Sequence, residues 1–204
     1  MLVLVRHGEA TANASGLLLG RTDVPLTALG RLQAAALARH LGPVTRLVSS
    51  PLARALDTAQ SLGLEVPVEV DERWVEVDYG EHEGRPLGDV PAEVWRRWRS
   101  DPSYRPAGGE SLGEVAERVR DACAGLFAEP GRGARGDDGD VVVVSHVSPI
   151  KAAVAWALGT GEGLDWRLRL STGSVSTIGW GAGEPVLHGF NWVPELPPAS
   201  GDGP

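Results

Sequence analysis

Two arginines and two histidines stand just after short apolar segments of this sequence. Arg6 and His7 directly follow the first segment, Arg54 lies about one helical turn beyond the second, and His146 comes shortly after the third. If these segments are parallel strands of one sheet, the four side chains meet at the carboxyl ends of the strands, where open α/β sheets bind ligands. Guanidinium and imidazole groups gathered in one cleft suit a phosphate dianion. The spacing therefore predicts a phosphate-binding site.

Each of these residues also has an ordinary structural explanation when it is considered alone. A histidine at a strand end is more often a hydrogen-bonded structural group than a nucleophile. Arg54 alone would be a solvated charge in the first turn of a helix, beside free backbone N–H groups. Glu76, between Val75 and Val77, would alone be an outward-facing strand residue. The functional interpretation therefore depends on their joint occurrence.

The elements that would position these residues alternate between strands and helices. Residues 2–5 and 141–144 are continuous apolar runs, which are typical of strands buried on both faces of a parallel sheet. Residues 46–48 predict a further strand, and residues 173–180 with 185–190 predict a late hairpin. This alternation indicates an α/β fold, and we expect three α/β/α layers around a largely parallel sheet.

Four segments open with residues that favour helix starts: Thr27, Ser50 followed by Pro51, the Ser111–Glu114 capping box, and Pro149. In three of these segments, apolar residues recur at helical spacing: Leu29, Leu32, Ala36 and Leu37; Leu112, Val115, Val119, Cys123 and Leu126; and Ile150, Val154 and Leu158. We expect a helix in each of the four segments, with its apolar face toward the sheet.

The length and composition predict one globular domain. A chain of 204 residues, of which 42% are hydrophobic and 23% charged, can bury a full core without disulfides. We expect residues 1–193 to form this domain. The loop at residues 131–140, rich in Gly, Arg and Asp, is predicted to be mobile, and the tail at residues 194–204 is predicted to be disordered.

The composition excludes several classes of protein. The net charge of −8 argues against a nucleic-acid groove or a basic membrane face, and no apolar stretch approaches the ~20 residues of a membrane span. Cys123 is the only cysteine, which rules out an internal disulfide and a cysteine-based metal cluster. Lys151 is the only lysine and lies outside any Gly-x-x-x-x-Gly-Lys motif, which rules out that class of NTPase. We expect a soluble cytoplasmic protein.

Five short motifs occur in order along nearly the whole chain: Arg6-His7-Gly8-Glu9 with Asn13; Ser49-Ser50-Pro51-Leu52-Ala53-Arg54-Ala55; Glu76-Val77-Asp78-Tyr79-Gly80 through Glu83-Gly84; Gly108-Gly109-Glu110-Ser111; and Val144-Ser145-His146. Together they resemble the motifs of the histidine phosphatase superfamily, the phosphoglycerate-mutase-like proteins. A lone Arg-His-Gly would be weak support, whereas five motifs in order are specific. The resemblance implies a phosphoglycerate-mutase-like fold.

The resemblance also implies a role for each matched residue. His7 would attack phosphorus and form a phosphohistidine, and Glu76 would be the general acid. The phosphoryl oxygens would be held by four side chains: Arg6, Asn13, Arg54 and His146. The resemblance implies neither a metal nor a cofactor, and the histidines of the sequence lack the ligand spacing that would favour a metallohydrolase.

The resemblance favours metal-independent hydrolysis of a small phosphomonoester. A phosphoglycerate-type mutase and a weakly catalytic phosphate-ligand binder are the alternatives. A binder needs neither a nucleophile nor an acid. A mutase must keep water out of a closed site, and residues 84–109, which should cover the site, look short for that purpose. The physiological substrate and the oligomeric state stay open, with a homodimer as one candidate.

Residues 84–109 are a candidate lid with two interpretations. Their arginines could hold an acidic leaving group, or Trp95 and Trp98 could pack inward from an amphipathic helix, which we favour. Two positions elsewhere depart from the family pattern. Ala10 replaces a residue that usually carries a hydroxyl, and Val147 stands where glycine commonly follows the second histidine. Val147 keeps the backbone N–H, but its branched side chain narrows the pocket.

Overall fold

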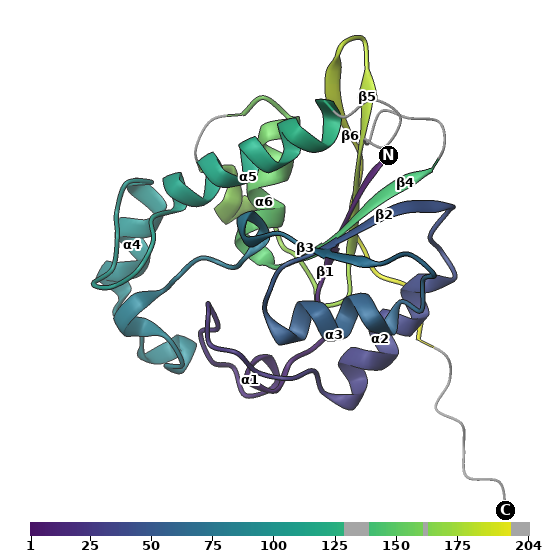
Figure 1. The fold of residues 1–204 in the computed structure, drawn as a ribbon. Coiled ribbons are helices and arrows are strands. Elements are labelled where there is room, and N and C mark those ends of the chain that lie inside the picture. The colour runs from purple at the N-terminus through teal and green to yellow at the C-terminus, as the bar shows by residue number, and fades with distance from the viewer. Residues whose placement is uncertain (129–138, 161–162, 197–204) are drawn as a thin grey trace, which may run out of the picture.

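One sheet runs through the middle of the structure (Figure 1). The computed structural model describes residues 1–128, 139–160 and 163–196, and within them the sheet has six strands: β1 (Leu2–Arg6), β2 (Val44–Ser49), β3 (Val68–Val70), β4 (Asp140–Ser145), β5 (Val175–Gly181) and β6 (Glu184–Trp192). Their order across the sheet is β3-β2-β4-β1-β5-β6. The first four of these run parallel, and β5 pairs antiparallel with both β1 and β6. The predicted largely parallel sheet and the late hairpin are both confirmed.

Helices lie on both faces of the sheet. The α-helices are α1 (Thr11–Ala14), α2 (Ala28–Ala38), α3 (Ala53–Ser61), α4 (Ala92–Ser100), α5 (Leu112–Ala128) and α6 (Val147–Ala157). Short 3-10 helices are η1 (Glu72–Trp74), η2 (Gly80–His82), η3 (Leu87–Asp89) and η4 (Leu164–Arg167). Helices α2 and α3 lie on one side of the sheet, and α5 and α6 lie on the other (Figure 1). The three-layer α/β/α architecture is therefore confirmed.

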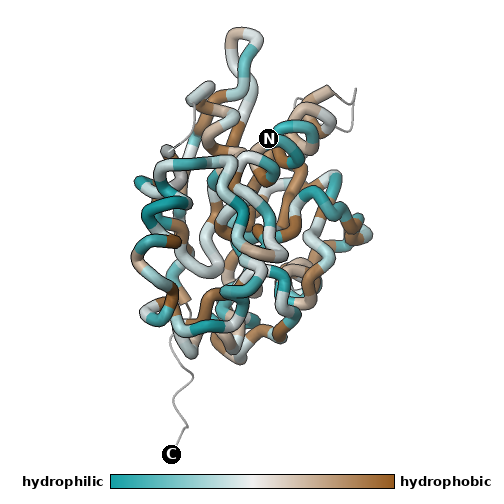
Figure 2. Tube along the Cα trace, turned by 90° about the vertical axis from the view of Figure 1, so that its left-hand side faces the viewer, coloured by the Kyte–Doolittle hydropathy of each residue, from teal (hydrophilic) through white to brown (hydrophobic). Residues whose placement is uncertain are grey.

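The alternation of side chains along β1 places the core on both faces of the sheet. Leu2 and Leu4 pack with α5 and α6, whereas Val3 and Val5 pack with α2 and α3. Burying such a side chain contributes about 1.5–3 kcal/mol. Figure 2 shows the hydrophobic stretches running through the interior, with hydrophilic stretches at many of the outer turns. Packing from two sides fixes the strands, and thereby the edge of the sheet at which they end.

Two of the predicted helix starts agree with the structure in detail. The Thr27 side chain accepts a hydrogen bond from Gly30 N and caps α2. Ser111 and Glu114 form the predicted capping box at α5, because each side chain accepts from the other's backbone N–H. The predicted start at Ser50 is wrong, since α3 begins at Ala53 with Leu52 as its N-cap. The Ser50 hydroxyl instead contacts His146, which follows the neighbouring strand β4 and is the N-cap residue of α6.

Three leucines that were predicted to face the sheet from α2 and α6 are exposed instead. Leu29 and Leu32 are 38% and 53% exposed, and Leu158, the C-cap residue of α6, is 45% exposed. Helix α2 instead buries mostly small residues, including Gly30 and Ala34, and so lies close to the backbone beneath it. A pattern of leucines at helical spacing does not reveal this, because apolar side chains also occupy much of a protein surface.

Two predictions concern segments that fall largely outside the described residues. These are the mobile loop at 131–140 and the disordered tail at 194–204. Within the described ranges, no helix is long and apolar enough to cross a membrane.

Candidate active site

Strands β1 and β4 bring His7 and His146 together. The two strands are paired in register up to Arg6 and Ser145, and the His7 backbone N–H donates to Ser145 O at 3.0 Å. Both imidazoles are buried, and their ring centroids lie 5.0 Å apart. Two histidines far apart in sequence thus meet at one edge of the sheet, as the sequence predicted.

The contacts of His7 define its tautomer. Its Nδ1 lies 2.7 Å from Gly8 O, and because a carbonyl oxygen only accepts, Nδ1 carries the proton. Burial lowers the pKa of His7 well below its usual value, and the charges of Arg6 and Arg54 lower it further. The ring is therefore neutral near pH 7, with an unprotonated lone pair on Nε2. This is the form that a nucleophilic imidazole requires.

The loop after β1 is fixed by close contacts of its backbone. Gly8 N donates to Thr58 Oγ1 at 3.1 Å. A Cβ on Gly8 would lie 2.2 Å from Gly30 O, so only glycine allows the loop to approach α2 this closely. Glu9, although part of the first motif, accepts from Thr27 Oγ1 at 2.9 Å, which makes it a structural contact to the start of α2.

The two predicted arginines are held through backbone carbonyls. Arg54 is fully buried in the first turn of α3 and donates to Thr22 O at 2.9 Å and Gly20 O at 2.5 Å. Arg6 donates to Leu170 O at 2.6 Å. Burial lowers the pKa of Arg54, and it lowers the pKa of Arg6 to about 10. Both guanidinium groups nevertheless stay charged near neutral pH, so the site is strongly positive.

The contacts of His146 leave one of its ring nitrogens unsatisfied. Its Nε2 lies 2.7 Å from Ser50 Oγ, whereas Nδ1 is buried with no hydrogen-bond partner in the described part of the chain. The Nε atoms of Arg6 and Arg54 are likewise buried and unpartnered there. Leaving such a polar group unsatisfied costs about 1–3 kcal/mol. Three of them around His7 point to an anionic ligand with several acceptor oxygens.

Glu76 faces the same edge of the sheet. It is 3% exposed and follows η1, so the interpretation as an outward-facing strand residue is wrong. The backbone N–H groups of Val147 and Ser148, in the first turn of α6, donate to its Oε2 and Oε1 at 3.0 and 3.1 Å. Val77 N also donates to Oε1, at 2.9 Å. The N–H that we expected Val147 to keep therefore orients this carboxylate.

The Asn13 side chain forms a hydrogen bond with the loop after β1 and not with the other predicted site residues. It lies in α1, and its Oδ1 accepts from Ala10 N at 3.1 Å. With Oδ1 used as an acceptor, the amide NH2 is the end that can donate to an anion. The methyl group of Ala10 is fully buried beside this contact.

Glu83 organises the loop that holds Arg54, which the sequence did not reveal. Its carboxylate accepts from the backbone N–H groups of Gly20, Arg21 and Thr22 at 2.9–3.3 Å, and from Thr22 Oγ1 at 2.8 Å. The carbonyls of Gly20 and Thr22 are the groups to which Arg54 donates. The approach is so close that a Cβ on Gly20 would lie 1.8 Å from Glu83 Oε1. Glu83 stands at the end of the third motif in the sequence, but nothing in that motif indicated that its carboxylate holds this loop.

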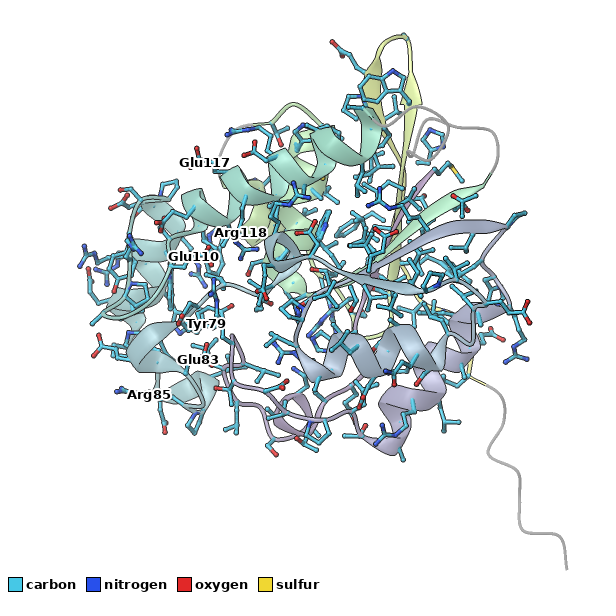
Figure 3. The ribbon with its side chains drawn as sticks, in the orientation of Figure 1. Tyr79, Glu83, Arg85, Glu110, Glu117 and Arg118 are labelled. Carbon is cyan, nitrogen blue, oxygen red and sulfur yellow. The ribbon has the colours of Figure 1, made fainter. Side chains whose placement is uncertain are left out.

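A second pair of charges supports the backbone of Glu76. Arg118, on α5, donates to Glu110 Oε1 at 2.9 Å and to the backbone oxygens of Arg73 and Glu76 at 2.6 and 3.5 Å. Glu110 also pairs with Arg21, at 3.2 Å. In Figure 3, Arg118, Glu110 and Glu83 follow one another from α5 toward the N-terminal loops. Glu110 is therefore part of an ion-pair network that shapes the site.

Helix α4 carries the tryptophans of the candidate lid. Trp98 is 2% exposed, and its ring lies 5.4 Å from those of both Tyr79 and Trp95. The favoured interpretation of an amphipathic helix with inward indoles thus agrees with the structure. The arginines of this segment contact neighbouring side chains: Arg96 pairs with Glu93, Arg97 lies over Tyr104, and Arg99 lies over Trp166.

No group of three or more His, Cys, Asp or Glu side chains suited to a metal ion occurs among the described residues. The site thus combines two buried arginines with two buried histidines, and burial lowers the pKa of both imidazoles well below the usual value.

Comparison with known proteins identifies the family. The family model of the histidine phosphatase superfamily (branch 1) matches residues 2–193. The chain belongs to this superfamily. A solved structure of the mycobacterial glucosyl-3-phosphoglycerate phosphatase in complex with VO3 superposes with a TM-score of 0.83 at 33% identity, covering 93% of this chain and 98% of the other. The family that the five motifs resemble is thus confirmed by the family model and by the superposition.

Two relatives from this superfamily illustrate its range. A bifunctional protein of Mycobacterium tuberculosis is 38% identical over 184 residues, which are 86% of this chain and 49% of the relative. The chain thus spans about half the length of that relative. A protein of Salmonella paratyphi B, named probable phosphoglycerate mutase, is 34% identical over 201 residues, covering 94% of this chain and 89% of its own.

Proposed function

We propose that this chain hydrolyses small phosphomonoesters through a phosphohistidine at His7, without a metal. The observation that carries the proposal is the set of three buried, unpartnered nitrogens on Arg6, Arg54 and His146 around a neutral imidazole. These donors match the equatorial oxygens of a phosphoryl group, whose transfer requires in-line positioning and neutralised charge. The VO3 complex of the mycobacterial phosphatase supports this ligand class.

In the first step, His7 Nε2 attacks phosphorus while the ester P–O bond opposite breaks. Arg6, Arg54 and His146 hold the phosphoryl oxygens, with the Asn13 amide as a fourth donor. Glu76 gives its proton to the leaving alkoxide, so the alcohol departs neutral. Glu76 Oε2 has one backbone partner, against two for Oε1, and is the oxygen better placed to carry this proton.

In the second step, the Glu76 carboxylate takes a proton from water as that water attacks the phosphohistidine. The P–N bond breaks, inorganic phosphate leaves, and both side chains regain their starting states. The backbone donors from α6 hold the carboxylate in one orientation for both steps.

A phosphoglycerate-type mutase is the second candidate, because the Salmonella relative carries that name. The two activities differ in the fate of the phosphoryl group. A hydrolase releases inorganic phosphate, whereas a mutase returns the group to another hydroxyl of its substrate. Incubation with 3-phosphoglycerate, followed by assay of free phosphate and of the isomer, distinguishes them. Release of phosphate without isomer supports the hydrolase.

Turnover should not depend on divalent metal ions, because Arg6 and Arg54 supply the positive charge of the site. We expect a chelator to leave the rate with 4-nitrophenyl phosphate unchanged. Vanadate, which adopts the trigonal-bipyramidal geometry of the transition state, should inhibit strongly. A large loss of rate on chelation that a divalent ion restores would contradict this prediction.

Glu83 should act as a positioning residue for Arg54. Glu83→Gln replaces one acceptor oxygen with an NH2 group that faces backbone donors, so the loop carrying Gly20 and Thr22 should shift. We expect the inhibition constant of vanadate to rise roughly tenfold, which corresponds to about 1.4 kcal/mol. The measurement is vanadate inhibition of aryl phosphate turnover, with the exposed Glu72→Gln as the matched control.

A double-mutant cycle with Arg54→Lys separates positioning from general stability. If Glu83 acts through Arg54, Glu83→Gln should have little further effect on vanadate inhibition in the Arg54→Lys background. Strictly additive effects would show that Glu83 only stabilises the fold, and would overturn its assignment as a positioning residue.

A further inference from the structure

A small cavity lies beside the proposed proton donor. Its volume is about 120 Å³, and its lining includes Tyr79, Trp95, Trp98, Val147, Ser148 and Trp166. These residues come from the segment after Glu76, from α4, from the first turn of α6 and from η4. The cavity is therefore formed where the candidate lid meets the body of the domain.

The cavity and Glu76 share the first turn of α6. Val147 and Ser148 line the cavity, and their backbone N–H groups donate to the Glu76 carboxylate. In the proposed reaction, Glu76 gives its proton to the leaving-group oxygen, so the rest of the leaving group must lie beside Glu76. Because the cavity and Glu76 share this turn, we assign the cavity to the leaving-group side, and this inference therefore rests on the proposed function.

The walls of the cavity are aromatic. The rings of Trp95 and Trp98 lie 5.4 Å apart, and those of Trp95 and Trp166 lie 6.2 Å apart in an edge-to-face arrangement. Burial and the charge of Glu76 raise the pKa of Tyr79, so its phenol is neutral. Indole and phenol rings favour flat apolar groups over hydrated polyols.

The cations near the cavity already have partners. The guanidinium group of Arg99 lies 5.4 Å from the centroid of the Trp166 ring, and that of Arg97 lies 4.1 Å from the centroid of Tyr104. Lys151 also lines the cavity, and it too interacts with another group of the protein. The lid arginines therefore contribute to packing, which removes the main argument for an acidic leaving group.

The volume sets the size of the group that fits. An apolar cavity of about 150 Å³ holds benzene, so this cavity suits one ring of that order. We infer that the aromatic pocket selects phosphomonoesters whose leaving group carries a flat apolar ring.

The experiment compares three alkyl phosphates with the full chain: 2-phenylethyl phosphate, glycerol 3-phosphate and 3-phosphoglycerate. All three are alkyl esters that need the same proton from Glu76, so a difference in kcat/KM reports mainly recognition of the leaving group. We expect 2-phenylethyl phosphate to be preferred by at least tenfold over each of the others, within the 10–200-fold range of hydrophobic pockets. A preference for either polar substrate would overturn the inference.

Two variants connect this preference to the pocket. Trp95→Ala should lower the ratio of kcat/KM for 2-phenylethyl phosphate to that for glycerol 3-phosphate by about tenfold. Trp166→Ala should lower it in the same direction, and because Trp166 is 37% exposed, its loss is compatible with folding. Arg96→Ala, at an exposed position on the same helix as Trp95, is the matched control and should leave the ratio unchanged. An unchanged ratio in both tryptophan variants would contradict the role of the pocket.

The same data separate the two levels of the proposal. If none of the three esters and no aryl phosphate is hydrolysed, the proposed phosphatase function fails. If all are hydrolysed but the phenyl ring gives no advantage, the phosphatase function holds and the aromatic pocket is not a specificity determinant.

Discussion

His7→Ala should reduce phosphatase turnover by at least about 10³-fold, because the residue would form the covalent bond to phosphorus. Rapid acid-free quenching of the wild-type protein with labelled substrate should trap a phosphoenzyme that is labile to acid and stable to base. His188→Ala, at an exposed position on β6, is the matched control and should keep full activity.

The burial of His7 requires a second variant in this test. Removing a buried ring leaves a cavity, so His7→Ala can also lower the free energy of unfolding. His7→Asn keeps a side-chain N–H that can donate to Gly8 O, as Nδ1 does in the wild type. Thermal unfolding monitored by circular dichroism should show both variants folded at assay temperature. Substantial phosphatase activity in either folded variant would refute the phosphohistidine.

Glu76→Gln should slow the hydrolysis of alkyl phosphates by about 10²–10⁴-fold, the usual contribution of general acid catalysis. A nitrophenyl phosphate leaves as a stable phenolate, so its transfer to His7 should slow much less. For that ester, attack of water on the phosphohistidine should become limiting and should appear as a burst of phenolate. Pre-steady-state time courses with both esters measure this difference, and Glu72→Gln, an exposed carboxylate nearby, is the control.

The pH profile gives this prediction a second readout. In the wild type, the rate should fall on the acid side as His7 gains a proton on Nε2 and can no longer attack phosphorus, at a pH well below the usual 6.5 because burial lowers the pKa of His7. The same acid limb should appear in Glu76→Gln, because it reports His7 and not the general acid. Equal losses for both esters without a burst would assign the acid to another group. Glu81 would then be tested next, since Glu110 is occupied by Arg118 and Arg21.

The strands and the edge at which they end could be predicted from the sequence. Apolar runs such as residues 141–144 are buried on both faces and end in polar residues, so His7 and His146 meet by topology alone. Local signals also located the caps at Thr27 and Ser111, because there the hydroxyl and its backbone partner lie three residues apart. Such contacts can be predicted from a short stretch of sequence.

The errors arise where a distant partner outweighs a local preference. Ser50 has the residue type of a helix cap, but its hydroxyl contacts His146, 96 positions away. Glu76 sits between two valines like a strand residue, yet the first turn of α6 binds its carboxylate. Glu83 reaches backbone groups 61 to 63 positions away. Hydrogen bonds of this kind follow from the packing of elements, for which one sequence carries no pairing signal.

The contact between Gly8 and Gly30 limits which substitutions this protein can accept in α2. Gly30 lies inside α2, where alanine would stabilise an ordinary helix by about 1 kcal/mol. A Cβ there would lie 2.2 Å from Glu9 O and would push the loop that carries His7. A displacement of about 1 Å at a reacting group can cost 10²-fold in rate. A stabilised helix at this position would therefore come with a slower enzyme, and engineering for heat resistance should leave this helix glycine untouched.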